Sequence, residues 1–200
     1  MALLYVNNNG TVLSNDAPTI HPGNRSHLYG DGVFESIRIM SGRTLNLENH
    51  ISRMLDGAKA IKLRTPSLYS TSFFEDKISE LLKKSEINDG GRCRLSLDRK
   101  PGGAYLPETN ESSFYIEVYP YQVSHFELNA KGFEVDIYLD IKLQKNFLSN
   151  YKTKAGLHYV MAALSAKEKE LDDVFMSDYR GNILETSSCN LFIVSNGVLY

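Results

Sequence analysis

The fold of this chain is decided by VFESIRIM, residues 33–40, and by the apolar pattern that follows it. Alternation along this stretch predicts a strand that places Phe34, Ser36 and Arg38 on one face. Residues 47–63 then carry apolar side chains at helical spacing. The pattern therefore predicts a strand followed, after a short turn, by an amphipathic helix.

The same two periodicities continue along the chain. Alternation predicts further strands at residues 3–6, 11–13, 92–98 and 114–120, and helical spacing predicts a helix at residues 72–84. Both patterns lapse near residues 121–132, which indicates an interdomain connection. A second unit follows, for which we expect a strand at 133–139, a helix at 155–171 and short strands at 174–177, 182–185, 190–194 and 198–200. Helices appended to antiparallel sheets indicate an α+β fold, with domains at 1–122 and 130–200.

The composition is that of an ordinary globular chain. Hydrophobic residues make up 42% and charged residues 23% of 200 residues, and the net charge is -2, so no global charge recruits nucleic acid or an anionic membrane. No apolar run approaches the ~18 residues of a membrane span, and the N-terminus lacks the basic region of a signal peptide. We therefore expect a cytoplasmic protein. Cys93 and Cys189 lie far apart and match no zinc spacing, so we expect no metal site.

Lys152 and Glu185 are candidates for cofactor chemistry. Lys152 precedes the predicted helix at 155–171, and Glu185 ends a predicted strand. A lysine amine with a lowered pKa can form a Schiff base with an aldehyde such as pyridoxal phosphate, and a carboxylate can hold the proton on the pyridine nitrogen. A lysine before a helix and a glutamate at a strand end are more often solvated charges, so both interpretations stay open.

Two further patterns concern phosphate binding. His50 and Arg53 lie one turn apart on the helix predicted at 47–63, and an arginine there is either a bidentate phosphate ligand or a solvated charge. The glycines of YGDGVFE, residues 29–35, do not match a dinucleotide fingerprint, because a strand and not a helix follows them. The pattern excludes a Rossmann-type site at this position.

Four segments together resemble the successive motifs of the class IV (fold-type IV) pyridoxal-phosphate enzymes. They are RSHLYGDGVFESIR at residues 25–38, LENHISRM at 47–54, YKT at 151–153 and GNILETSSCNLF at 181–192. This family includes branched-chain and D-amino-acid aminotransferases and aminodeoxychorismate lyase. The resemblance implies a two-domain D-amino-acid aminotransferase-like fold, with an α/β sandwich domain at 1–122 and a cofactor-binding domain at 130–200 that is incomplete at its C-terminal end.

The resemblance also implies roles for individual residues. Lys152 becomes the Schiff-base lysine, with Lys154 as a competitor, and Glu185 becomes the partner of the pyridine nitrogen. Arg53 becomes a phosphate ligand, and Asn190 stands beside the cofactor or bonds the turn backbone. The substrate pocket is expected to be built from Tyr29, Phe34, Arg38, Arg94 and Tyr105, where Arg94 is equally well a surface strand arginine.

Three functions are compatible with these residues. The first is a transaminase that moves an amino group between an amino acid and a 2-oxo acid with pyridoxal 5'-phosphate. The second is a lyase that releases 4-aminobenzoate and pyruvate from aminodeoxychorismate. The third is a non-catalytic, truncated remnant that keeps the fold. The resemblance further implies a homodimer, with small-molecule substrates and neither nucleic acid nor membrane as partners.

Overall fold

The computed structural model describes residues 5–17, 20–121 and 126–200, and the chain divides into two compact units. Unit 1 comprises Met1–Phe126 and Asn150–Ala155, and unit 2 comprises Glu127–Ser149 and Gly156–Tyr200. Leu3 and Leu4 of the expected first strand, and residues 122–125 of the expected interdomain connection, fall outside the described residues. Across the described ranges, no helix combines the length and the apolar character that a membrane crossing requires.

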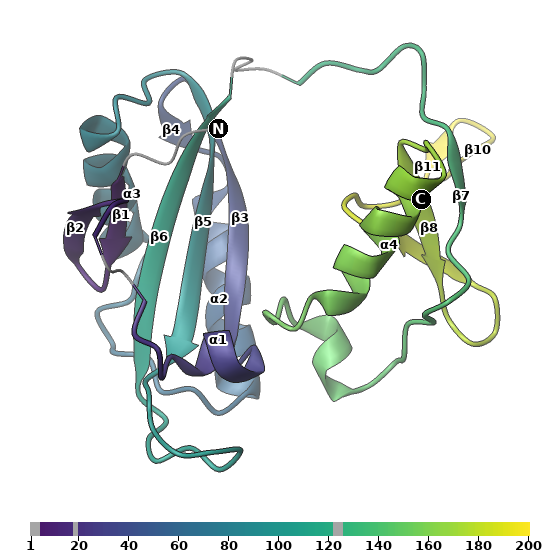
Figure 1. Cartoon of the computed structure of the whole chain (residues 1–200). Coiled ribbons are helices and arrows are strands. Elements are labelled where there is room, and N and C mark those ends of the chain that lie inside the picture. Colours follow the sequence, from purple (N-terminus) through teal and green to yellow (C-terminus); the bar gives the residue numbers. More distant parts are fainter. Residues whose placement is uncertain (1–4, 18–19, 122–125) are drawn as a thin grey trace. The chain divides into compact units, whose positions relative to one another are not determined.

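Unit 1 is built on a six-stranded antiparallel sheet with the strand order β2-β1-β6-β5-β3-β4 (Figure 1). The strands are β1 (Tyr5–Asn8), β2 (Thr11–Ser14), β3 (Gly32–Met40), β4 (Arg43–Thr44), β5 (Gly90–Arg99) and β6 (Ser112–Tyr121). In the centre of the sheet, Ile37 pairs with Cys93, which in turn pairs with Val118. The pleat therefore gives one apolar face and one polar face.

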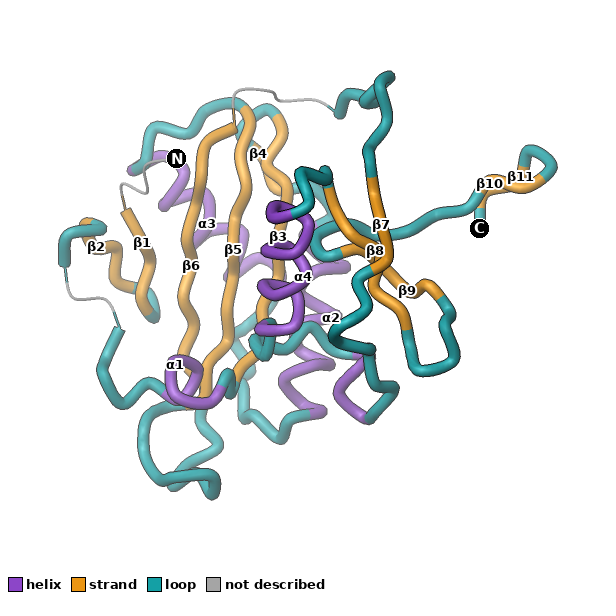
Figure 2. The backbone as a smooth tube through the Cα atoms, turned by 45° about the vertical axis from the view of Figure 1, so that its right-hand side comes forward, coloured by secondary structure: helices purple, strands orange, loops and turns teal. Residues whose placement is uncertain are grey.

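Two helices cover the apolar face of this sheet: α2 (Leu47–Ala60) and α3 (Thr71–Lys84) (Figure 2). Both follow the predicted helical periodicity. Phe74, Ile78 and Leu81 of α3 are fully buried, which stabilises the unit by about 2 kcal/mol for each side chain. Among the described residues, α2 and α3 both pack on the apolar side of the sheet, and the opposite side of β3, β5 and β6 carries polar and charged side chains.

A short helix, α1 (Arg25–Tyr29), leads into β3 and was not expected from periodicity, because five residues are too few to show a period. The sequence signals for α1 are the residues that cap its two ends. The side-chain oxygen of Asn24 accepts a hydrogen bond from the backbone nitrogen of His27, and Gly30 ends the helix with φ 65°. This helix brings the segment that precedes β3 to the end of the sheet.

Unit 2 has a smaller sheet, in which β8 lies between β7 and β9. β7 (Val135–Ile137) runs parallel to β8 (Asp173–Ser177), and β9 (Ile183–Thr186) runs antiparallel to it. Between β7 and β8 the chain forms a 3-10 turn, η1 (Phe147–Asn150), and the helix α4 (Leu157–Glu168). Beyond β9 lies a hairpin of β10 (Val194–Ser195) and β11 (Val198–Leu199).

Two expectations for this half of the chain are wrong. The strand expected at 190–194 is confined to Val194 and Ser195, and Phe192 and Ile193 are largely exposed instead of packed on a layer. The helix expected from residue 155 begins at Leu157. Its start is delayed because Lys154 donates its backbone N–H to Gly32, which holds the preceding residues against β3.

Candidate active site

Arg53 is held by a buried carboxylate on β3. Glu35 is fully buried, and its Oε1 accepts a hydrogen bond of 2.7 Å from Nε of Arg53, while its Oε2 bonds Nη2 of the same guanidinium. His50 Nδ1 lies 2.8 Å from Glu35 Oε2. The bond from Glu35 raises the pKa of Arg53 above its usual value. Arg53 is half-exposed, so its remaining N–H groups can bind an anion such as a phosphate.

Phe34, Arg94 and Lys152 form a cluster on the polar face of the unit 1 sheet. The Cζ atom of Arg94 lies 3.8 Å, and Nζ of Lys152 4.8 Å, from the centroid of the Phe34 ring. Burial lowers the pKa of Arg94, an effect that the nearby Arg92 reinforces and Glu117 opposes. Arg94 and Lys152 thus place two cationic groups beside one aromatic ring, and such groups can bind a carboxylate.

Residues 150–155, which we call the lysine segment, pair with the edge of β3 through a short β-bridge. Val33 pairs with Thr153, Phe34 donates to the carbonyl of Lys152, and Lys154 donates to the carbonyl of Gly32. Because side chains alternate along such a pair, Lys152 and Lys154 both lie on the polar face that carries Phe34. A segment from the second half of the sequence thus completes unit 1.

The two lysines have different surroundings. Lys152 is exposed, whereas the side chain of Lys154 is only 16% exposed and pairs with Asp98 at 2.5 Å. Lys154 lines a pocket of about 380 Å³ in unit 1, together with Arg94, Asp98 and Glu117. Of the two amines, that of Lys154 therefore lies in the more enclosed and more polar environment.

The other predicted substrate residues of unit 1 lie at different places. Tyr29 and Tyr105 contact each other, with ring centroids 5.4 Å apart, although Tyr105 is 89% exposed. Arg38 lies farther along β3, with its Cζ 4.7 Å from the centroid of the Tyr121 ring. The predicted substrate residues therefore form an aromatic pair, the Phe34 cluster and a separate Arg38 contact.

Glu185 belongs to unit 2, where Tyr159 of α4 donates a hydrogen bond of 2.8 Å to its Oε1. Burial and the Glu185 carboxylate raise the pKa of Tyr159 to about 12, so this phenol keeps its proton at neutral pH. Asn190 is exposed in the turn after β9. Glu185 is thus a carboxylate oriented by a side-chain donor from α4.

Asp173 fixes the backbone that follows Glu185. Its carboxylate accepts hydrogen bonds from the hydroxyls of Thr186, Ser187 and Ser188 at 2.7, 2.6 and 2.9 Å. Burial alone would raise the pKa of Asp173, but these bonds lower it below its ordinary value. The hydroxyl-rich segment is therefore tied to an internal carboxylate.

Sequence reasoning missed four of these residues. Glu35 falls on the apolar face of the 33–40 stretch, and a charge in a core position is a usable signal for a buried pair. Asp98, Tyr159 and Asp173 meet their partners only through long-range folding, and no local pattern marks them.

Comparison with known proteins agrees with this architecture. Residues 32–200 match the family model described as amino-transferase class IV. A probable branched-chain-amino-acid aminotransferase of Rickettsia bellii is 28% identical over 99% of this chain and 68% of its own length.

Two solved structures share the fold. The branched-chain aminotransferase of Thermoproteus uzoniensis, solved with norvaline, superposes with a TM-score of 0.85 at 23% identity, over 99% of this chain and 67% of that one. An aminotransferase of Brucella abortus bound to PLP gives 0.80 at 22% identity, over 99% and 70%. The chain thus spans about two thirds of the length of these proteins. Since the family model matches most of the sequence, this chain belongs to the class IV aminotransferases.

Proposed function

We propose that this chain provides the catalytic lysine and much of the cofactor site of a pyridoxal-phosphate-dependent aminotransferase, which moves an amino group between an amino acid and a 2-oxo acid. The observation that carries the proposal is the pairing of residues 152–154 with the edge of β3. It puts two lysines on the sheet face that carries Arg94 and Phe34. An amine beside a carboxylate-binding arginine is what an amino-acid site requires.

Each unit, taken by itself, carries groups that suit the cofactor. Arg53 offers oriented N–H donors to a phosphate, Glu185 offers a carboxylate to a pyridinium, and the lysine segment offers a primary amine. When bound, pyridoxal phosphate supplies an electron sink for a substrate carbon. The chain's own residues bind the phosphate at Arg53, hold a proton near Glu185 and move a proton at a lysine Nζ. Arg94 would receive a substrate carboxylate, with Phe34 as a wall.

Of the two lysines, we propose Lys154 as the one that bonds the cofactor, with Lys152 as the second candidate. The sequence resemblance favours Lys152, but Lys154 is less exposed and lines the pocket with Arg94. Asp98 would hold its ammonium group in the pocket until the cofactor arrives. The variants Lys154→Ala and Lys152→Ala are matched controls for each other. We expect loss of the visible absorption band of a lysine-bound cofactor in Lys154→Ala alone, and the reverse pattern would assign the role to Lys152.

Product analysis tests the activity. The protein is incubated with cofactor and an amino acid, with and without an acceptor 2-oxo acid. We expect one turnover without acceptor and continued turnover with it. Release of pyruvate and 4-aminobenzoate from aminodeoxychorismate without an acceptor would identify a lyase instead. Cofactor binding without either product, in the 200-residue chain and in any longer form, would favour a non-catalytic protein.

Glu185→Gln tests the partner of the ring nitrogen. A neutral amide cannot hold the proton, so we expect cofactor to bind while turnover falls by at least about a hundredfold. Unchanged turnover would remove Glu185 from this role.

A further inference from the structure

The loop between β5 and β6 is held in place by a buried arginine. Arg25, which is 2% exposed, donates from Nη1 to the carbonyl oxygens of Gly102, Gly103 and Ala104, at 3.0, 3.2 and 2.5 Å. Its Nη2 donates to the carbonyl of Tyr105 at 3.4 Å. One guanidinium thus binds four successive backbone carbonyls.

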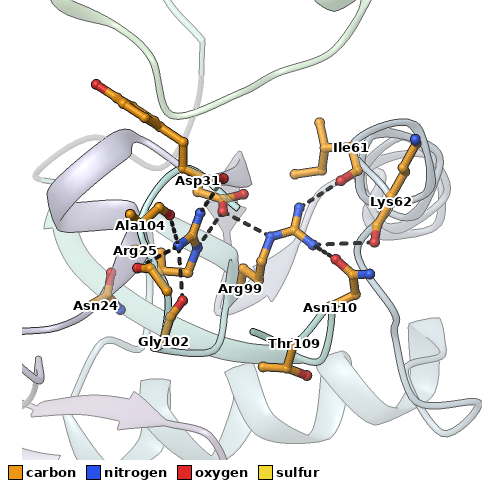
Figure 3. A network of polar contacts seen from close by, with 12 residues as sticks. Asn24, Arg25, Asp31, Ile61, Lys62, Arg99, Gly102, Ala104, Thr109 and Asn110 are labelled. Atoms are coloured by element: carbon orange, nitrogen blue, oxygen red, sulfur yellow. Dashed lines mark hydrogen bonds and ion pairs between the residues drawn. The ribbon is translucent and has the colours of Figure 1, made fainter. Parts of the chain in front are cut away.

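Arg25 shares its counter-ion with a second buried arginine. Asp31 Oδ2 accepts from Nε of Arg25 at 2.8 Å and from Nε of Arg99 at 2.9 Å (Figure 3). Burial would raise the pKa of Asp31, but hydrogen bonds from Arg99 and Arg25 lower it, so the carboxylate stays charged between them. Arg99 directs its other donors away from the loop tip, to the carbonyls of Ile61 and Lys62 and to the side-chain Oδ1 of Asn110 at the far end of the loop.

The tip of this loop gains little from apolar burial. Tyr105 and Leu106 are 89% and 85% exposed. Gly103 has φ 74°, and a Cβ there would come within 2.2 Å of the Leu106 carbonyl oxygen, so the turn is tight. Ordering a loop costs roughly 1–2 kcal/mol per residue. The bonds from Arg25, together with the backbone bridge between Gly103 and Pro107, offset that cost.

The same arginine also contacts the aromatic pair. Its Cζ lies 5.0 Å from the centroid of the Tyr29 ring, and Tyr29 contacts Tyr105. Arg25 therefore touches Tyr29 directly and holds Tyr105 through its backbone. Both tyrosines were expected from the sequence to wall the substrate pocket.

We propose that Arg25 is a positioning residue for substrate selection, which holds the 102–105 backbone so that Tyr105 stays against Tyr29 and the two rings present a fixed wall to the substrate side chain. This inference rests on the proposed aminotransferase function. Arg25 acts through the tyrosines and touches no reacting atom.

The matched pair Arg25→Lys and Arg99→Lys tests it. Both variants weaken the Asp31 network, but only Arg25→Lys removes the fork that binds the loop carbonyls. In Arg25→Lys we expect KM for amino acids with bulky side chains to rise about tenfold while kcat changes less than about threefold. KM for alanine should change little, because a small side chain does not reach the wall. Arg99→Lys should lose comparable stability without this change in selectivity.

A readout independent of turnover is cleavage by chymotrypsin after Tyr105, since proteolysis requires local opening of several residues. We expect cleavage of Arg25→Lys to be at least about tenfold faster than that of Arg99→Lys. Equal rates in the two variants, or an unchanged ratio of KM values, would overturn the proposal.

If Arg25→Lys does not fold, backbone ¹⁵N relaxation of the unchanged protein decides the question. The 102–105 amides should be as ordered as those of β5, and a loop that moves on the nanosecond timescale would contradict the role of Arg25. The cleavage and relaxation results hold without cofactor. Failure of the aminotransferase proposal, seen as absence of turnover in the unchanged protein, is therefore distinguishable from failure of this one.

Discussion

Unit 1 and unit 2 bury their apolar side chains to very different extents. Among the described residues, the core of unit 1 contains twenty buried side chains from the sheet, from α2 and α3 and from the segments that flank these helices, whereas that of unit 2 contains five: Tyr138, Ala162, Ala166, Val174 and Met176. On α4, the large apolar side chains Leu157, Val160 and Leu164 are about half or more exposed. Unit 1 is therefore stabilised by its own core, and unit 2 depends more strongly on polar contacts such as those of Asp173.

The largest expected effect on stability comes from comparing two phenylalanine-to-alanine variants, one in each unit. Phe74 is fully buried among Tyr69, Phe73 and Phe114, and its replacement by alanine should cost about 4 kcal/mol of unfolding free energy. Phe192 of unit 2 is 62% exposed, and Phe192→Ala should cost less than about 0.5 kcal/mol. Urea denaturation of both variants measures the difference, and equal costs would refute the contrast.

Asp173→Asn should destabilise unit 2 by about 2 kcal/mol at neutral pH, because three hydroxyls and the Val174 N–H lose a charged acceptor. Since the folded pKa of Asp173 lies below its ordinary value of 3.8, its stabilisation is present above that value and is lost as the pH falls through the folded pKa. The variant should lack this acid dependence. Hydrogen exchange of β8 and β9, followed from about pH 5 down to about pH 2, measures this loss because the range covers both the ordinary and the lowered pKa of the carboxyl group. A parallel acid response in both proteins would mean that Asp173 does not carry it.

Tyr159→Phe should have a smaller effect than Phe74→Ala or Asp173→Asn, about 1 kcal/mol, since it removes one hydrogen bond to a carboxylate and keeps the ring. The folded pKa of about 12 lies above the ordinary value of 10.0, so the tyrosine stabilises unit 2 below pH 10 and this contribution is lost as the pH rises toward 12. Ultraviolet titration of tyrosinate should lose one late-titrating group in the variant. An unchanged titration curve would show that Tyr159 does not hold its proton against Glu185.

Local patterns predicted the elements of unit 1 well. Strand β3 covers the predicted alternation, and α2 begins at Leu47 as the spacing indicates. Apolar residues that repeat every two positions indicate a strand, and those that repeat every 3.6 positions indicate a helix. Both signals are strong where a large core makes one face of the element apolar. They are weaker in unit 2, where α4 is apolar around much of its surface and the 190–193 segment alternates without a layer to cover it.

The sequence predicted which residues contribute to the site, but it did not predict how they are arranged in space. The resemblance supplied Arg53, Glu185 and the lysine segment, but nothing local indicated that residues 150–155 return to the edge of β3. Because that contact joins residues more than a hundred positions apart, only the folded structure shows that both lysines share a face with Arg94. The partners Glu35, Asp98 and Tyr159 follow from the same long-range contacts.

The central claim is that a lysine on the edge of β3 bonds the cofactor. Its most direct measurement is reduction of the cofactor-loaded protein with borohydride, followed by mass spectrometry of its peptides. We expect a pyridoxyl group within residues 152–154, on Lys154. A label spread over surface lysines such as Lys77 and Lys169, with none in this segment, would contradict the claim.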